Sequence, residues 1–475
     1  MSAHLTDAPP SRAMQRRSVA IAFVIFVVSF LIFSCRNLDA WHFPVLYGED
    51  GQWTGRILSR GFFVTALRDK DFPTVGVVLM DQLALWISVL LPGGILRVPL
   101  VIAFLSNAFM AGIATLAALG LKRSLSPLIR FAMWTTVLLM PVGMDGGEIF
   151  GRVLNLPFWF PILQVLLVAR MIERPVSRNG TVAALAGSLL AGWTFPVSIG
   201  ITALAALMTL QVRRQTWRLG FSPQTWAMLG VFVLSVLPLQ AASFGKGAAT
   251  APYQPSGFVE FSLARTTLYP LVSLVYSHLN DATVVALTLA VALGAGMSVA
   301  ALRRLDMARR KMATLFIGSF LLYALATAVM RRGFTAILNG SYDATFPDRY
   351  FYGVNVLAVF AILVVAELLA ARSATRRLIA IFWIALFVNG AIFGETVFEL
   401  SHPALSWRQH GNWSQEVCAT LAGKGAIPFD PQATHSAIAS YPWEGASRWK
   451  VELPTALLNS LARTTACEKT RLIAR

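Results

Sequence analysis

The sequence has little charge and, above all, little acid. Only 13% of its 475 residues are charged, whereas 56% are hydrophobic, and Asp and Glu number 23 against 40 Lys and Arg. Soluble domains carry about a quarter charged residues, so this composition excludes a soluble globule and predicts a protein with many membrane spans. The formal charge of +17 lies in small basic clusters between apolar runs, which is the pattern that orients membrane proteins. We therefore expect membrane lipids, and no nucleic acid, as partners.

Cysteine is almost absent. Cys35, Cys418 and Cys467 are too few for a disulfide scaffold, and no Cys-x-x-Cys or Cys/His spacing predicts structural zinc. Cys418 and Cys467 fall on the same outer side in the topology below, so a disulfide between them is one alternative and two free thiols the other. The first apolar run, residues 18–34, is too long for a signal-peptide core and lacks a cleavage site, so we expect it to remain as a span.

The basic clusters predict the topology. Arg12, Arg16 and Arg17 precede the first run, so residues 1–17 form a cytoplasmic leader and the first helix leads outward. We interpret residues 74–91 as a helix on the outer membrane surface. Counting it as a span would invert every later basic cluster, and a carboxylate such as Asp81 is costly inside a membrane.

The result is an all-α polytopic membrane protein with about eleven transmembrane helices. The membrane domain covers residues 18–394 and has surface helices in a first outer loop at 35–96, and a small periplasmic C-terminal domain follows at 395–475. The expected spans are 18–34, 98–119, 131–142, 156–168, 181–191, 197–211, 224–241, 283–302, 314–330, 350–371 and 378–394.

Two adjacent carboxylates, Glu49 and Asp50, stand in the first outer loop. One interpretation is chemical, because an ionised carboxylate at the membrane surface can take the proton from a hydroxyl that attacks an activated sugar. Nearby negative charge also stabilises an oxocarbenium-like transition state. The other interpretation is structural, with Asp50 capping a helix over residues 52–67. Both can hold together.

A second outer loop contains Glu148, Arg152 and Asn155. Glu148 could hold a metal ion or a sugar hydroxyl, or it could pair with Arg152 one helical turn away. No cofactor is required by the pattern. A divalent cation stays open, because two acidic loops offer oxygen ligands without demanding a metal.

Four short stretches carry a family resemblance, namely GEDG at 48–51, EIFG at 148–151 with Asn155, GWTFP at 192–196 and DRYF at 348–351. With this order and sidedness the chain resembles membrane glycosyltransferases of the GT-C fold, and more closely a group of bacterial GT-C-like integral membrane proteins. The resemblance implies an inverting transfer of a sugar from a polyprenyl phosphate donor to a glycan, lipid or protein acceptor. It places the reaction on the outer face of the bacterial inner membrane, with Glu49 or Asp50 as catalytic base.

A phosphate-linked donor needs cationic partners, and arginine suits phosphate because its planar fork binds two oxygens at once. We prefer Arg349, since Asp348 can orient it and Tyr350 begins an aromatic run at the interface. The alternative for each outer arginine is an anchor to lipid headgroups. The residues expected to bind donor phosphate or substrate are Arg56, Glu148, Arg152, Asn155, Arg332, Asp348, Arg349 and Tyr350.

Two other classes of function fit the composition. A transporter or flippase for lipid-linked glycan should carry ionisable groups inside its spans, whereas the acids here stand at the outer ends. A non-catalytic assembly protein would bind through its C-terminal tail and would not depend on the acidic pair.

Overall fold

The fold is almost wholly helical in the computed structural model. The model describes residues 12–68, 70, 72–142, 149–173, 178–213, 218–220, 222–243, 265–266, 269, 281–330, 350–369, 373–389, 413–425, 427–439, 450–462 and 467.

The α-helices are α1 (Arg12–Cys35), α2 (Asp39–His42), α3 (Gly48–Arg60), α4 (Phe62–Arg68), α5 (Val75–Val89), α6 (Val98–Leu119), α7 (Pro127–Leu139), α9 (Phe160–Glu173), α10 (Arg178–Gly192), α11 (Pro196–Thr209), α12 (Pro223–Ser243), α15 (Asp281–Ala301), α16 (Met307–Met330), α17 (Tyr352–Leu369), α18 (Ser373–Asn389), α20 (Trp413–Leu421) and α21 (Thr455–Ala462). Short 3-10 helices are η1 (Gly94–Arg97), η3 (Leu156–Trp159) and η6 (Leu302–Arg304). The strands are β1 (Gln211–Arg213), β2 (Arg218–Gly220), β3 (His435–Ala439) and β4 (Lys450–Pro454), and they form two antiparallel pairs, β1 with β2 and β3 with β4.

Each expected span overlaps a helix in the described part of the chain, namely α1, α6, α7, α9 to α12 and α15 to α18. In the described part of the chain, five helical segments are long and apolar enough to cross a membrane: 16–35, 94–119, 156–173, 307–329 and 352–369. The predicted all-α, multi-pass membrane architecture is therefore confirmed, while the number of spans stays a prediction. Residues 390–412 lie outside the described residues, so the domain boundary at 395 also stays a prediction.

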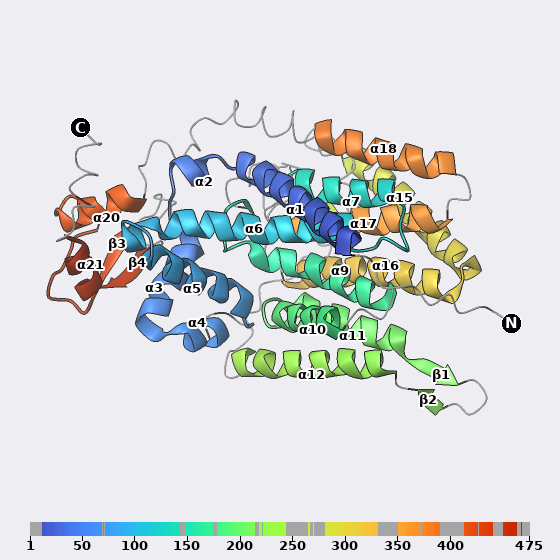
Figure 1. The fold of residues 1–475 in the computed structure, drawn as a ribbon, viewed down its shortest axis with the longest axis horizontal. Coiled ribbons are helices and arrows are strands. Elements are labelled where there is room, and N and C mark those ends of the chain that lie inside the picture. Colours follow the sequence, from blue (N-terminus) through green and yellow to red (C-terminus); the bar gives the residue numbers. More distant parts are fainter. Residues whose placement is uncertain are drawn as a thin grey trace.

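The long helices run side by side along the longest axis of the molecule (Figure 1). Helices α3, α4 and α5 lie at one end, next to the small C-terminal unit formed by β3, β4, α20 and α21. The β1–β2 hairpin, which follows the expected cytoplasmic end of α11, lies at the opposite end. Residues of the expected first outer loop and the C-terminal unit therefore share one end of the molecule, while their sidedness in the membrane stays a prediction.

One local prediction is wrong. The expected helix over residues 52–67 is two helices, α3 and α4, because the chain turns at Gly61 with φ +82°, a conformation that favours glycine. Asp50 is not the N-cap of α3. The helix begins at Gly48 after an extended Tyr47, whose side chain makes no capping bond. Asp50 lies inside the first helical turn, and its side chain is available for other contacts.

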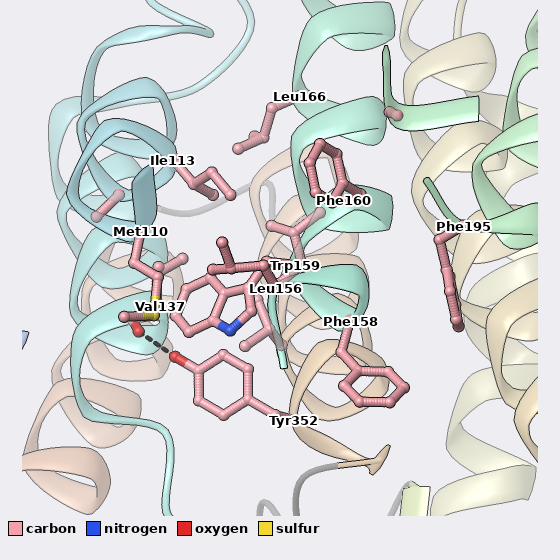
Figure 2. Packing of buried hydrophobic residues seen from close by; sticks show 14 of the residues in the cluster. Met110, Ile113, Val137, Leu156, Phe158, Trp159, Phe160, Leu166, Phe195 and Tyr352 are labelled. Atoms are coloured by element: carbon pink, nitrogen blue, oxygen red, sulfur yellow. Dashed lines mark hydrogen bonds between the residues drawn. The ribbon is translucent and has the colours of Figure 1, made fainter. Parts of the chain in front are cut away.

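The core packs aromatic side chains against aliphatic ones (Figure 2). The rings of Trp159 and Tyr352 lie 4.5 Å apart, and the Tyr352 hydroxyl donates to the carbonyl of Val137, so the polar tip of a buried ring is satisfied. A Cβ on Gly353 would lie only 2.3 Å from the carbonyl oxygen of Phe158. Helix α17 is therefore in direct contact with η3, which follows the second outer loop.

Candidate active site

The first turn of α3 buries Asp50. Gly48 has φ +43° and turns the extended chain into the helix. The Asp50 side chain is 1% exposed, and its Oδ1 accepts a hydrogen bond from the backbone N–H of Leu154 at 2.6 Å. Its Oδ2 is buried and has no hydrogen-bond partner among the described residues. One oxygen thus fixes the carboxyl group, and the other forms no hydrogen bond within the described part of the chain.

The surroundings tune the acidity of Asp50. Burial raises its pKa to about 7, because water no longer solvates the charged form. The positive charge of Arg152 and the Leu154 N–H oppose this shift, while the negative charge of Glu49 adds to it. The positive end of the α3 dipole lies next to a carboxylate in the first turn and favours its charged form. Asp50 therefore changes charge near neutral pH.

Polar residues from the turn after α1 and from α6 hold the second outer loop against the first turn of α3. Asn37 Nδ2 donates to the Phe150 carbonyl at 2.6 Å, and Asn107 Oδ1 accepts from the Gly151 N–H at 3.0 Å. Ser106 Oγ donates to the Arg152 carbonyl at 2.9 Å. Sequence reasoning missed these residues, although two of them interrupt the apolar run 98–119. They place the Leu154 N–H where Asp50 can accept a hydrogen bond from it.

Arg152 lies inside the protein and not on its surface. It is 1% exposed, its Nη1 donates to the Val45 carbonyl at 2.7 Å, and its guanidinium carbon lies 5.5 Å from the centre of the Tyr47 ring. Its charge acts on Asp50. A role in binding donor phosphate stays a prediction. Asn155, also expected in the site, is fully buried just before η3.

Glu49 has a different environment from its neighbour. Its Oε1 forms an ion pair with Lys70 Nζ at 2.5 Å, and the two side chains are 28% and 32% exposed. The structure thus separates the adjacent carboxylates into one that is buried with an unbonded oxygen and one that is partly exposed and paired.

Asp81 and Thr54 are the residues near Asp50 that sequence reasoning did not assign to a site. Thr54 Oγ1 lies 2.9 Å from the backbone carbonyl of Asp50 and 3.0 and 3.1 Å from the two carboxyl oxygens of Asp81. Asp81 is 0% exposed. Its position in the middle of an apolar helix was the available signal, and we used it only to place that helix on the outer surface.

The GWTFP stretch positions the helix that carries Asp81. The backbone N–H of Val75 donates to the Trp193 carbonyl at 3.0 Å, and that of Gly76 donates to Thr194 Oγ1 at 2.9 Å. These bonds satisfy N–H groups that have no partner within a helix at its N-terminus. The break between α10 and α11 therefore fixes the start of α5 as well as turning the chain.

The C-terminal unit covers α3 from outside. Cys418 and Cys467 form a disulfide, which decides between the two alternatives left by the sequence. Trp413 is 2% exposed, its backbone N–H donates to the Pro44 carbonyl at 3.0 Å, and its Nε1 donates to the Ile95 carbonyl at 3.2 Å. A Cβ on Gly55 would lie 2.6 Å from the backbone oxygen of Glu452. The unit is thus packed against the first outer loop.

The remaining expected residues fall into two groups. Arg56 is partly buried on α3, and the half-buried Tyr350 has its ring 5.3 Å from that of Phe158. Glu148, Arg332, Asp348 and Arg349 lie outside the described residues. Within the described ranges, no group of three or more His, Cys, Asp or Glu side chains is placed to hold a metal ion. Metal dependence stays open.

No model of a known protein family matches the chain, and no curated protein matches it. Among solved structures, the chain is similar to the oligosaccharyltransferase of Archaeoglobus fulgidus, crystallised with an acceptor peptide containing the NVT sequon tethered by a disulfide bond. The two are 13% identical, with a TM-score of 0.36. The match covers 85% of this chain and 57% of that chain, so this chain spans little more than half of the length of that enzyme.

Proposed function

We propose that the chain is a membrane glycosyltransferase that moves one sugar from a polyprenyl phosphate donor to a glycan, lipid or protein acceptor on the outer face of a bacterial inner membrane, with Asp50 as its base. The observation that carries the proposal is the Asp50 carboxyl group. It is held through Oδ1 while Oδ2 has no partner in the described part of the chain, at the end where two outer loops and the C-terminal unit meet.

The reaction needs one proton acceptor. As the acceptor hydroxyl oxygen attacks the anomeric carbon, its proton passes to Asp50 Oδ2, and the bond from that carbon to the donor phosphate oxygen breaks. Polyprenyl phosphate leaves with the electron pair, and Asp50 then loses its proton to water. A base is most effective when its pKa is close to the working pH, and the pKa of Asp50 is about 7. The inverting course is implied by the family resemblance alone.

In this proposal Glu49 is not the base and acts only through its ion pair and its charge. Its ion pair with Lys70 ties α3 to the segment after α4, and its charge raises the pKa of Asp50. An exposed ion pair contributes about 0–1 kcal/mol to stability. We therefore expect the neutral variant Glu49→Gln to fold and to keep most of its activity.

The test compares two isosteric variants in the same membranes. Transfer of radiolabelled sugar from a polyprenyl phosphate donor to endogenous acceptor is measured for the wild type, Asp50→Asn and Glu49→Gln. Loss of the base should slow transfer by about 100-fold or more, since general base catalysis contributes factors of this size. Glu49→Gln should stay within about threefold, because its charge acts only indirectly on the base.

Equal transfer by Asp50→Asn and the wild type would overturn the assignment of the base. A large loss in Glu49→Gln with normal activity in Asp50→Asn would assign the base to Glu49 instead. Surface-glycan composition, compared with and without the gene and after rescue by each variant, identifies the sugar and the acceptor.

The distribution of charge argues against the transporter alternative. In the described helices that correspond to expected spans, charged residues lie within the first two turns or the last turn, as Arg17 does in α1, Arg130 in α7 and Glu367 in α17. Transport pathways carry ionisable groups near the membrane midplane.

A further inference from the structure

The Thr54 hydroxyl lies between two groups that could each take its hydrogen. It is 2.9 Å from the Asp50 carbonyl, four residues back along α3, and 3.0 and 3.1 Å from the two oxygens of Asp81 on α5. A threonine hydroxyl donates one hydrogen bond and accepts through its lone pairs. In a helix it commonly donates to the carbonyl four residues back. If the single hydrogen of Thr54 is shared between the carbonyl and Asp81, each acceptor receives only part of a hydrogen bond.

The two contacts are compatible if Asp81 supplies the second hydrogen. A protonated Asp81 donates to Thr54 Oγ1, and Thr54 donates to the Asp50 carbonyl. An ionised Asp81 would be a fully buried acceptor sharing one hydroxyl hydrogen, and burying a poorly paired charge costs several kcal/mol. Burial also raises the pKa of Asp81 well above its usual value, the charge of Asp50 raises it further, and the Thr54 hydrogen bond lowers it.

The described elements that pack against α5 carry few charged residues. Helices α6 and η3 contain no charged residue, and α10 has its one charged residue, Arg178, at the end remote from Trp193 and Val75. Asp50 is the charge that acts on Asp81. The other charged residues on α3, α4 and η1 are all at least partly exposed, namely Glu49, Arg56, Arg60, Arg68 and Arg97. The surroundings therefore favour the neutral acid.

We propose that Asp81 is a positioning residue of the site that stays protonated, donates to Thr54, and so holds the first turn of α3 while Asp50 carries the single negative charge of the pair. Two ionised carboxylates in one buried site would repel each other. The relay from Asp81 through Thr54 to the Asp50 carbonyl fixes the backbone whose side chain presents Oδ2. The catalytic consequence rests on the proposed function, whereas the protonation state of Asp81 does not.

The protonation state is tested by infrared spectroscopy of the purified full-length protein at pH 8, where Asp50 is mostly ionised. The wild-type minus Asp81→Asn difference spectrum should contain the carbonyl stretching band of a protonated carboxylic acid, and deuterium oxide should shift it. The matched control, wild type minus Glu49→Gln, should show no band of a protonated carboxylic acid. Carboxylate bands alone in the Asp81→Asn difference would overturn the proposal, whatever the enzyme assay gives.

The positioning role is tested by transfer assays. Asp81→Asn keeps an N–H that can donate to Thr54, so its rate should stay within about threefold and the midpoint of its pH profile should not move. Asp81→Leu and Thr54→Val break the relay and should lose at least about tenfold in kcat, because small displacements of catalytic groups are costly. Thr54→Ser should restore the rate. A loss in Asp81→Asn as large as in Asp50→Asn, or a fall in its pH midpoint by about one unit, would overturn the role by showing that Asp81 works as a charged group.

Discussion

At the residue scale, one titration of Asp50 should affect activity and stability in opposite directions. The pKa of Asp50 is raised from 3.8 to about 7 in the folded protein, mainly by burial. The base is active when ionised, so transfer should rise with pH and level off above about 7. Because the pKa of Asp50 is higher in the folded protein than in the unfolded chain, its protonation stabilises the folded protein fully at pH values below the unfolded pKa. This contribution to stability is lost as the pH rises from about 4 through about 7. The loss has a slope of at most about 1.4 kcal/mol per pH unit.

The variant Asp50→Asn removes the titration but keeps an oxygen that can accept from Leu154. Its melting temperature in detergent should therefore fall less than that of the wild type between pH 5 and pH 8. Parallel melting curves for the two proteins across that range would show that Asp50 is ionised in the folded state well below pH 7. The Glu49→Gln protein, whose side chain is partly exposed, is the matched control.

The acidic pair stands out in the sequence because the chain is poor in acid, and its catalytic role stays a prediction. Which of the two is buried could not be predicted from the sequence. That depends on Leu154, 104 residues further along the chain, and on Lys70, which neutralises Glu49. The Thr54–Asp81 contact likewise depends on how α3 is aligned against α5, and the pattern of either helix alone does not contain this information.

At the scale of elements, α5 should be sensitive to crowding at its first turn. A Cβ on Gly76 would lie 2.5 Å from Thr194 Oγ1 and 2.6 Å from Phe160 Cζ, and Phe160 is fully buried. Gly76→Ala should therefore destabilise the protein by about 1–3 kcal/mol, the usual cost of overpacking, and should reduce transfer by moving Asp81.

Gly112→Ala on α6 is the matched control for Gly76→Ala, because its new Cβ meets nothing within 4 Å. Alanine is about 1 kcal/mol better than glycine inside a helix, so this variant should be neutral or more stable. Thermal unfolding in one detergent compares the two. Equal melting temperatures would mean that the GWTFP stretch does not hold α5.

Element bounds were predictable where an apolar run contains no charged residue, and α6 spans residues 98–119 as expected. They were less so where helices continue into charged sequence. Helix α16 begins at Met307 and not near 314, because Asp306 Oδ1 accepts from the Arg309 N–H at 2.9 Å and caps the helix. Lys and Arg have good helix propensity, so they can form the first turn of a helix. A prediction of spans from hydropathy leaves them out and therefore starts the helix too late.

At the scale of the whole molecule, the sequence predicted which elements share an end but not how they touch. The basic clusters placed the first outer loop and the tail on one side of the membrane, and both lie at the same end of the structure (Figure 1). Their contact through Trp413 and Ile95 joins residues 318 positions apart. Such a pairing follows from the packed surfaces of two units, which local patterns do not describe.

The disulfide makes the proposed sidedness of the whole chain testable. Disulfides persist in oxidising compartments and are rare in the cytosol, so Cys418 and Cys467 should be bonded in cells if the C-terminal unit faces the periplasm. The experiment uses a Cys35→Ser background, which removes the exposed free thiol. In intact spheroplasts, the protein should not react with a membrane-impermeant maleimide until an impermeant reductant is added, and each chain should then carry two maleimide labels. Labelling without reductant, and only after the membrane is opened, would place the unit in the cytoplasm and with it the Asp50 site.

Replacing both cysteines by serine should cost about 2–4 kcal/mol of stability, since the bond closes a loop with a sequence separation of 49.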